Sequence, residues 1–169
     1  MNFFVQRSNK KNISYVTYEK KRILCFVGKN GIGRKKREGD LITPVGCYKM
    51  TKIYYRDTKV NNLKTGIPIQ KIDKKYVWCV DPRNKMYNSL IRTQVKCSHE
   101  KLLRSDGVYD IVVVLNFNIS PSKKFKGSAI FLHCTDENKK YTAGCVAIKK
   151  KDLIDLVRHI TPLSSLIIS

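Results

Sequence analysis

The stretch YDIVVVLNFNISPSKKFKGSAIFLHC (residues 109–134) contains two short, almost wholly apolar runs that a polar connection separates. The runs at 109–117 and 128–134 are rich in β-branched and aromatic residues, and both are shorter than a typical helix, so they predict β-strands. A strand that is apolar at nearly every position needs cover on both of its faces. We therefore expect these two runs to be central strands of a sheet.

Other β-rich runs alternate with turn signals along the first three-quarters of the chain. Residues 12–19 and 22–28 predict neighbouring strands, and a further strand is expected after Pro44. The connection at 29–40 is rich in glycine and charge, but it lacks the Gly-Lys-Ser/Thr ending of a phosphate-binding loop. The glycines therefore indicate a polar connection rather than a nucleotide site.

Helical patterns are few. One helix is predicted over 150–160, where apolar residues recur at i, i+3, i+4 and i+7 and Pro162 follows the end. A shorter helix is expected to begin at Ser98, whose hydroxyl can cap residues 99–103. The last residues, 165–169, predict a final strand.

These elements predict one mainly β domain with a few helices over residues 1–169, since no repeat, low-complexity block or linker divides the chain. Several successive strands favour a sandwich or partly open barrel over a doubly wound α/β fold. A chain of 169 residues can bury a substantial core without disulfides or metal ions.

The composition is strongly basic, with 34 Lys and Arg against 13 Asp and Glu and a formal net charge of +21. Such a surface attracts polyanions, whether nucleic acid, an anionic membrane or an acidic cell-wall polymer. The basic runs are scattered among expected loops and are not interleaved with aromatic residues, as they are in a face that binds single-stranded nucleic acid. We therefore expect a solvated, lysine-rich surface and no nucleic-acid partner.

Apolar segments for membrane insertion or export are not apparent. No apolar run reaches the ~20 residues of a membrane-spanning helix, and the N-terminal residues do not resemble a secretion signal. We therefore expect a soluble chain that either works in the cytoplasm or lacks its export signal.

Six cysteines occur without any Cys-x-x-Cys pair, which disfavours a zinc ribbon or a thioredoxin-like site. Several of them lie in apolar, strand-like runs. Mostly free and buried thiols are expected.

Two residues suggest covalent chemistry: His133 ends a predicted buried strand, and Cys145 lies beyond a polar loop. A thiol is a strong nucleophile only as the thiolate, and a histidine within hydrogen-bond reach can take its proton and later return it to a leaving amine. Gly144 lets the chain turn tightly, so amides near Ala143, Gly144 and Cys145 could hold an oxyanion. Spacing alone leaves open a simpler interpretation, a hydrogen-bonded core histidine and an unrelated cysteine.

FLH (131–133) followed by YTAGCVAI (141–148) resembles the catalytic motif of the L,D-transpeptidase (YkuD-type) family, in which a strand-end His precedes a Ser/Thr-His-Gly-Cys segment. KREGDLITPVGCYKM (36–50) resembles the Thr-Pro-x-Gly segment of the same family. Other segments resemble a compact bacterial subgroup of it, and together the likeness covers roughly residues 25–169. These segments are CVDPRNKMYNSL (79–90), CSHEKLLRSDGVYDIVVVLNFN (97–118) and GSAIFLHC (127–134).

The resemblance implies a β-rich, mixed, sandwich-like domain and a cysteine acyltransferase that acts on peptidoglycan stem peptides. Carried over by position, Cys145 is the nucleophile and His133 the general base, while Thr142 and Gly144 belong to the loop before the nucleophile. The implied reaction attacks the L-to-D peptide bond of a tetrapeptide, releases D-Ala and passes the acyl group from the thioester to an amine. The resemblance implies no metal or cofactor, and a periplasmic or cell-envelope location.

The sequence departs from the family pattern at two positions. The usual His of the Ser/Thr-His-Gly-Cys loop is Ala143, and the Arg or Asn two residues after the Cys is Ala147. We expect His99 to replace the missing histidine; its alternative is an exposed residue of a short helix. The remaining residues expected to line the substrate groove lie in the subgroup-like segments: Arg83, Tyr87, Asn88 and Glu100. For Arg83, a surface salt bridge is the alternative.

Neighbouring residues have expected structural roles. Strand alternation points Cys134 to the opposite side from His133, so Cys134 is expected to pack, while its backbone carbonyl could orient the imidazole. His159 lies near the C-terminal end of the predicted helix, where a cation is favoured and no chemistry is expected.

Two other functions stay open on the sequence. With water in place of the amine, the same site is an L,D-carboxypeptidase or a peptidoglycan amidase. A basic polyanion-binding protein without catalysis accounts for the charge but leaves the order of the motifs unexplained. The sequence does not indicate an oligomeric state.

Overall fold

The computed structural model describes residues 1–136 and 138–169, and this part of the chain contains fourteen strands and one helix. The predicted mainly β fold with a C-terminal helix and strand is confirmed. The strands are β1 (Asn2–Gln6), β2 (Ile13–Tyr18), β3 (Lys21–Phe26), β4 (Ile32–Gly33), β5 (Thr43–Pro44), β6 (Gly46–Tyr55), β7 (Ile69–Lys71), β8 (Tyr76–Cys79), β9 (Leu90–Arg92), β10 (His99–Lys101), β11 (Ile111–Leu115), β12 (Phe131–Cys134), β13 (Val146–Ile148) and β14 (Ser165–Ile168), and the helix is α1 (Lys150–Val157).

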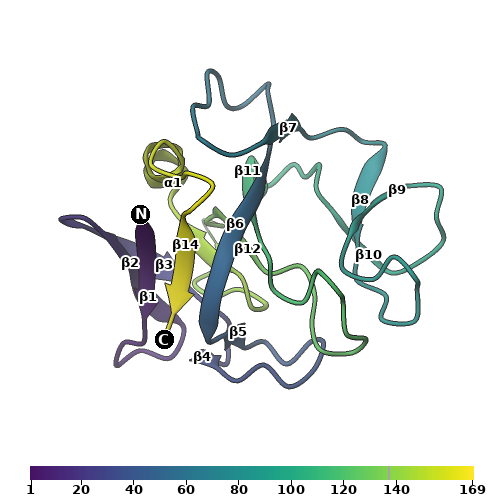
Figure 1. Cartoon of the computed structure of the whole chain (residues 1–169), viewed down its shortest axis with the longest axis horizontal. Coiled ribbons are helices and arrows are strands. Elements are labelled where there is room, and N and C mark those ends of the chain that lie inside the picture. The colour runs from purple at the N-terminus through teal and green to yellow at the C-terminus, as the bar shows by residue number, and fades with distance from the viewer. Residues whose placement is uncertain (137) are drawn as a thin grey trace.

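Nine strands form one mixed sheet in the order β11-β12-β13-β3-β2-β1-β14-β6-β7. Because β11 also pairs with β6, the hydrogen-bonded ladder from β11 to β6 closes on itself as an irregular barrel, with β7 outside the ring. Figure 1 shows β1 and β14 side by side, near both termini, with α1 at one end of them. A three-stranded sheet, β10-β8-β9, lies on the opposite side of the molecule from β1, β2 and β3 (Figure 1).

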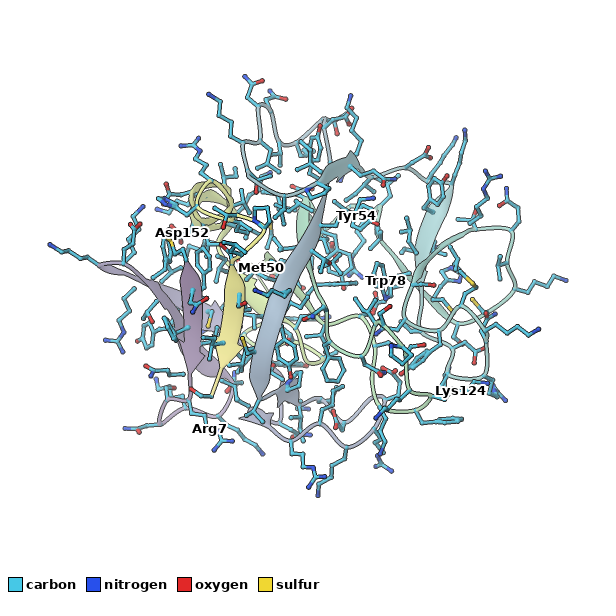
Figure 2. The ribbon with its side chains drawn as sticks, viewed as in Figure 1. Arg7, Met50, Tyr54, Trp78, Lys124 and Asp152 are labelled. Atoms are coloured by element: carbon cyan, nitrogen blue, oxygen red, sulfur yellow. The ribbon has the colours of Figure 1, made fainter. Side chains whose placement is uncertain are left out.

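The strand β11 is covered on both faces, as its sequence predicts. All five of its residues are buried. Ile111, Val113 and Leu115 face the main core, while Val112 and Val114 face a second apolar cluster. That second cluster also contains Tyr54 and Trp78, which Figure 2 labels between β6 and the three-stranded sheet, together with Phe131 and Cys145.

Most of the other predicted elements are present. Residues 12–19 and 22–28 contain β2 and β3, which pair antiparallel, and the strand expected after Pro44 is β6. The predicted helix 150–160 is found as α1, which ends at Val157. Its buried residues, Leu153, Leu156 and Val157, pack into the main core, as does Ile160 beyond its end.

The prediction of a short helix after Ser98 is wrong. Residues 99–101 form β10, in which His99 lies opposite Cys79 and Glu100 opposite Trp78. The Ser98 carbonyl accepts a hydrogen bond from the N–H of Val80 at 3.0 Å. A helix of about one turn gains few backbone hydrogen bonds, whereas the edge of β8 offers a partner for this segment.

The state of the cysteines and the basic surface agree with the sequence-based expectations. All six thiols are free; Cys47 is exposed, Cys97 is half-buried and the other four are buried. Figure 2 shows nitrogen-tipped side chains around the whole outline of the molecule, in keeping with its net charge of +21. Within the described residues, the structure contains no helix with the length and apolar character to cross a membrane.

Candidate active site

A cavity of about 380 Å³ opens where β12 and β13 approach the three-stranded sheet. Its wall includes the loop before β5, the residue after β8, β10 with the turn that follows, the segment leading into β12, β12 itself and the loop that ends at Cys145. The wall residues with ionisable or nucleophilic side chains include Lys35, Glu38, Glu100, Arg104, His133 and Cys145.

Cys145 lies at the base of this cavity and is 7% exposed. Its thiol donates to the carbonyl of Ala129 over 3.1 Å and receives the N–H of Phe131 over 3.3 Å. Burial raises the pKa of the thiol to about 12, although the Phe131 N–H and the ammonium of Lys35 oppose the shift. Without a bound substrate the residue is therefore a protonated thiol.

His133 reaches the same cavity from the adjacent strand. The strands β12 and β13 run parallel, with Leu132 opposite Val146 and His133 opposite Ala147, so the imidazole and the thiol come from neighbouring strand positions. The ring nitrogen Nδ1 lies 2.8 Å from the carbonyl oxygen of Cys134. If Nδ1 carries the proton, this carbonyl holds the ring and Nε2 is left as the acceptor.

The imidazole of His133 is neutral near pH 7. Burial lowers its pKa to about 4, against the opposite influence of the Cys134 carbonyl. The ring also packs edge-to-face on Tyr109, with 5.2 Å between centroids. Among the hydrogen bonds of the described residues none joins the imidazole to the Cys145 thiol, which is directed at Ala129 instead.

The loop before Cys145 is held by threonine hydroxyls. Thr142 Oγ1 donates to the Cys145 carbonyl at 2.7 Å and accepts the N–H of Gly144 at 3.1 Å, and Thr43 Oγ1 donates to the same carbonyl at 3.2 Å. Gly144 has φ +142°, and an added Cβ would meet the carbonyl oxygen of Ile42 at 3.0 Å. Only glycine fits this turn without strain.

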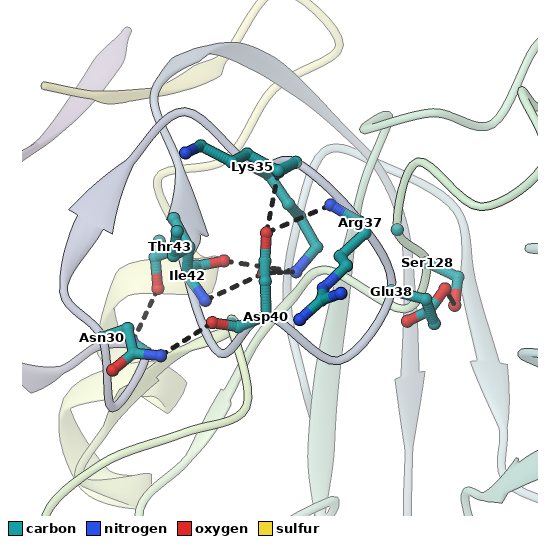
Figure 3. A network of polar contacts seen from close by, with 12 residues as sticks. Asn30, Lys35, Arg37, Glu38, Asp40, Ile42, Thr43 and Ser128 are labelled. Atoms are coloured by element: carbon teal, nitrogen blue, oxygen red, sulfur yellow. Dashed lines mark hydrogen bonds and ion pairs between the residues drawn. The ribbon is translucent and has the colours of Figure 1, made fainter.

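A buried ion pair between Lys35 and Asp40 lies next to the loop that ends at Cys145. The ammonium of Lys35 lies 2.7 Å from Asp40, and the two side chains are only 3% and 9% exposed. Figure 3 shows Asp40 at the centre of this network, where it also accepts the backbone N–H groups of Lys36 and Ile42. The Lys35 nitrogen would lie 3.5 Å from a Cβ at Gly144, so a positive charge lies beside the loop that ends at Cys145.

The model of the L,D-transpeptidase catalytic domain, the YkuD family, matches residues 4–168 of this sequence. The chain belongs to this family. Its members act on peptidoglycan and are typically associated with the cell envelope. No curated protein matches the sequence.

Two of the residues expected to line the groove of this L,D-transpeptidase domain lie at or near its cavity. Glu100 lines the wall, 3.9 Å from the guanidinium of Arg104, and burial raises the pKa of its carboxyl group. The Tyr87 hydroxyl donates to the carboxylate of Glu38, which also accepts the hydroxyl of Ser128 at 2.8 Å (Figure 3 shows the second contact). Tyr87 therefore positions Glu38, a residue of the wall.

Asn88 is a buried residue that positions neighbours of the cavity. It is 1% exposed, and its Oδ1 accepts the indole N–H of Trp78 at 3.0 Å and the N–H of Ala129 at 2.9 Å. Its amide nitrogen donates to the carbonyls of Phe117 and Asn118. Since the Ala129 carbonyl accepts the Cys145 thiol, Asn88 helps to fix the residue on which this thiol rests.

The two remaining predicted residues lie elsewhere. Arg83 is an exposed side chain, 85% accessible, that faces Asp81 at 3.6 Å, as in the salt-bridge alternative. His99 is exposed, its Nδ1 lies 2.8 Å from the carbonyl of Cys97, and it borders a different hollow from the one that holds Cys145. Neither side chain contributes to the wall of the cavity.

Several wall residues of the L,D-transpeptidase domain are not predicted from the sequence, among them Lys35, Arg104 and Tyr109. Nothing in the local sequence indicates that Lys35 folds back onto Asp40. Arg104 forms a forked contact with Asp106, two residues on, and stacks over Tyr109. The closely spaced Arg-x-Asp pair was the one available signal.

Metal ligands do not gather in this cavity. Across the described residues no group of three or more His, Cys, Asp or Glu side chains is placed to hold a metal ion.

Proposed function

We propose that this domain is a cysteine acyltransferase that cleaves an L-to-D peptide bond in a peptidoglycan stem peptide and transfers the acyl group to an amine. The observation that carries the proposal is the placement of Cys145 and His133 in one cavity, in a chain of the L,D-transpeptidase family: His133 lies on β12, and Cys145 directly precedes the neighbouring strand β13. The family's usual association with the cell envelope supports action on wall material there.

The first half-reaction begins when the substrate displaces the Cys145 thiol from Ala129. The thiol then passes its proton to Nε2 of His133, which is the free acceptor when Nδ1–H is held by the Cys134 carbonyl. A neutral imidazole is ready to accept this proton, and burial of both groups disfavours a standing ion pair. The thiolate therefore forms as the carbonyl carbon is attacked, not before.

The tetrahedral intermediate places negative charge near the loop 143–145. The Gly144 N–H is already engaged by Thr142, so the amide of Cys145 is the donor that we assign to the oxyanion. The Lys35 ammonium beside Gly144 adds a favourable field. His133 returns its proton to the leaving amine of the D-residue, and a thioester on Cys145 remains.

The second half-reaction resolves the thioester. An acceptor amine enters the cavity, loses a proton to His133 and attacks the thioester carbon, which releases the thiol and forms a new amide. Carboxyl groups of the wall, among them those of Glu100 and Glu38, can hold an ammonium before it reacts.

Mass spectrometry after incubation with a disaccharide-tetrapeptide tests the function. A cross-linked dimer that the wild-type chain and a Cys47→Ala control form, and that Cys145→Ala does not, supports the transferase. Loss of D-Ala or of the whole peptide without dimer reassigns the site to a hydrolase. Full activity of Cys145→Ala would overturn the assignment of the nucleophile, and inactivity of every form would favour the non-catalytic polyanion-binding alternative.

A further inference from the structure

Two thiols outside the catalytic cavity lie in contact. Cys79 Sγ and Cys97 Sγ are 3.4 Å apart. Cys79 ends β8 and is fully buried, whereas Cys97 precedes β10 and is half-buried. We propose that Cys79 and Cys97 form a reversible disulfide, with a low-molecular-weight disulfide such as oxidised glutathione as the oxidant.

Backbone hydrogen bonds fix the residues around the pair. Cys79 is tied to Ser89 through its N–H and to Asn88 through its carbonyl, both at 2.9 Å. Val80 N–H reaches the Ser98 carbonyl at 3.0 Å, which clamps the residues beside both cysteines. A disulfide needs its sulfurs about 2.05 Å apart. Side-chain rotation at Cys97, in the irregular segment before β10, can supply that approach without a new backbone arrangement.

The difference in burial assigns the two roles. The Cys97 thiolate, which meets the solvent, attacks one sulfur of oxidised glutathione; a mixed disulfide forms and one glutathione thiolate leaves. The Cys79 thiolate then attacks the Cys97 sulfur and expels the second glutathione. The protein loses two protons and two electrons, and the small disulfide is reduced to two thiols.

The electrostatic surroundings make this exchange slow at neutral pH. Burial raises the pKa of Cys97 to about 11, and the contact with Cys79 and the charge of Asp81 act in the same direction. Since only the thiolate attacks, the rate is expected to rise with pH.

The pair lies next to the catalytic cavity without belonging to it. Val80, which follows Cys79, and Glu100, three residues after Cys97, both line the cavity wall. A bond between the two cysteines therefore ties together the strand ends that carry these wall residues. This inference does not depend on the proposed transferase activity.

Peptide mapping of the full chain tests the proposal. The protein is incubated with oxidised glutathione at pH 8, quenched with acid and digested with trypsin, which releases YVWCVDPR (76–83) and CSHEK (97–101). We expect these two peptides joined by a disulfide as the main oxidised product, and their separation by dithiothreitol. The same linked product is expected from Cys47→Ser, in which an exposed cysteine is removed.

Two other outcomes would overturn the proposal. In the first, Cys97 is found only as the mixed disulfide with glutathione, and Cys79 remains a free thiol. In the second, Cys97 forms a disulfide with Cys47 as readily as with Cys79. Because the wild-type chain supplies the readout, poor folding of a Cys79 variant cannot obscure the result. Thermal unfolding gives a second readout, in which the oxidised chain melts about 5 °C or more above the reduced chain, since the bond closes a loop between residues 79 and 97.

Discussion

At the scale of single residues, burial keeps both Cys145 and His133, the pair that we propose to react, neutral in the free protein. The pKa of Cys145 is raised to about 12 and that of His133 is lowered to about 4, in both cases first by burial. Many cysteine enzymes instead hold a thiolate beside an imidazolium. Here the thiol donates to the carbonyl of Ala129, a residue whose N–H is bound by Asn88.

Alkylation rates follow from this arrangement. In the free protein we expect Cys145 to react with iodoacetamide more than about tenfold slower than the exposed Cys47, because burial suppresses its thiolate. Peptide mass spectrometry at pH 7.5 measures both sites in one sample. A Cys145 that reacts first would mean that the thiolate is preformed.

The pH dependence of folding tests the state of His133. The unfolded chain binds a proton on this histidine below about pH 6.5, while the folded chain does so only below about pH 4. The unfolded state thus binds more protons in this window, so stability is full above pH 6.5 and falls as the pH drops toward 4, by about 2–4 kcal/mol.

Urea unfolding at pH 5 and pH 7 measures this effect. His133→Gln should lose much of the difference between the two pH values. His159→Gln, at a half-buried histidine that faces Glu19 and does not line this cavity, should keep it. Equal pH dependence in wild type and His133→Gln would show that the imidazole is not buried in the neutral form.

At the scale of elements, the segment 34–42 matters more than its polar sequence indicates. It folds around Asp40, whose pKa burial alone would raise, but which Lys35 and the neighbouring N–H groups together hold below its ordinary value. The side chain of Lys35 thereby comes to rest beside Gly144. One polar connection thus supports the loop that ends at Cys145.

Breaking the buried pair is expected to be costly. Lys35→Met leaves the Asp40 carboxylate buried without its ion-pair partner, and we expect a loss of about 3–5 kcal/mol in the free energy of unfolding. Urea denaturation measures it, and Lys35→Met/Asp40→Asn should regain part of the loss. The matched control is Lys71→Met, at an exposed pair with Asp57, which should leave the urea midpoint almost unchanged.

The elements also show what the sequence can and cannot predict. The central strands, the paired strands β2 and β3, and α1 follow from local patterns of apolar residues, because each buries a regular face or both faces. The strand β10 does not, since its state depends on β8, a partner twenty residues away whose edge is invisible in a local window. The order of the motifs along the chain predicts Cys145 and His133 as site residues. It does not predict Lys35, because that side chain reaches the cavity only through the turn that residues 34–42 form around Asp40.

At the scale of the whole molecule, closure of the strand ring depends on β14. This strand lies between β1 and β6 and buries Leu166 and Ile168 in the main core. We expect a chain that ends at Ser164 to lose its cooperative thermal unfolding transition, because both neighbouring edges are left without a partner.

A matched pair of substitutions distinguishes the effect of losing the buried contacts of β14 from the effect of shortening the chain. Leu166→Asp places a charge in the core and should unfold the chain, whereas Leu163→Asp, at a side chain that is 78% exposed, should melt as the wild type does. Circular dichroism against temperature measures both. A cooperative transition in the shortened chain would show that the ring is stable without β14.

The pairing of β1 with β14 also has a consequence during synthesis on the ribosome. β1 is made before every other strand of the ring and β14 after them, yet Asn2–Val5 pair in register with residues 165–168. Until β14 has left the exit tunnel, therefore, one edge of β1 and one edge of β6 have no strand to pair with. The barrel closes only after β14 emerges, and the nascent chain carries two open sheet edges until then.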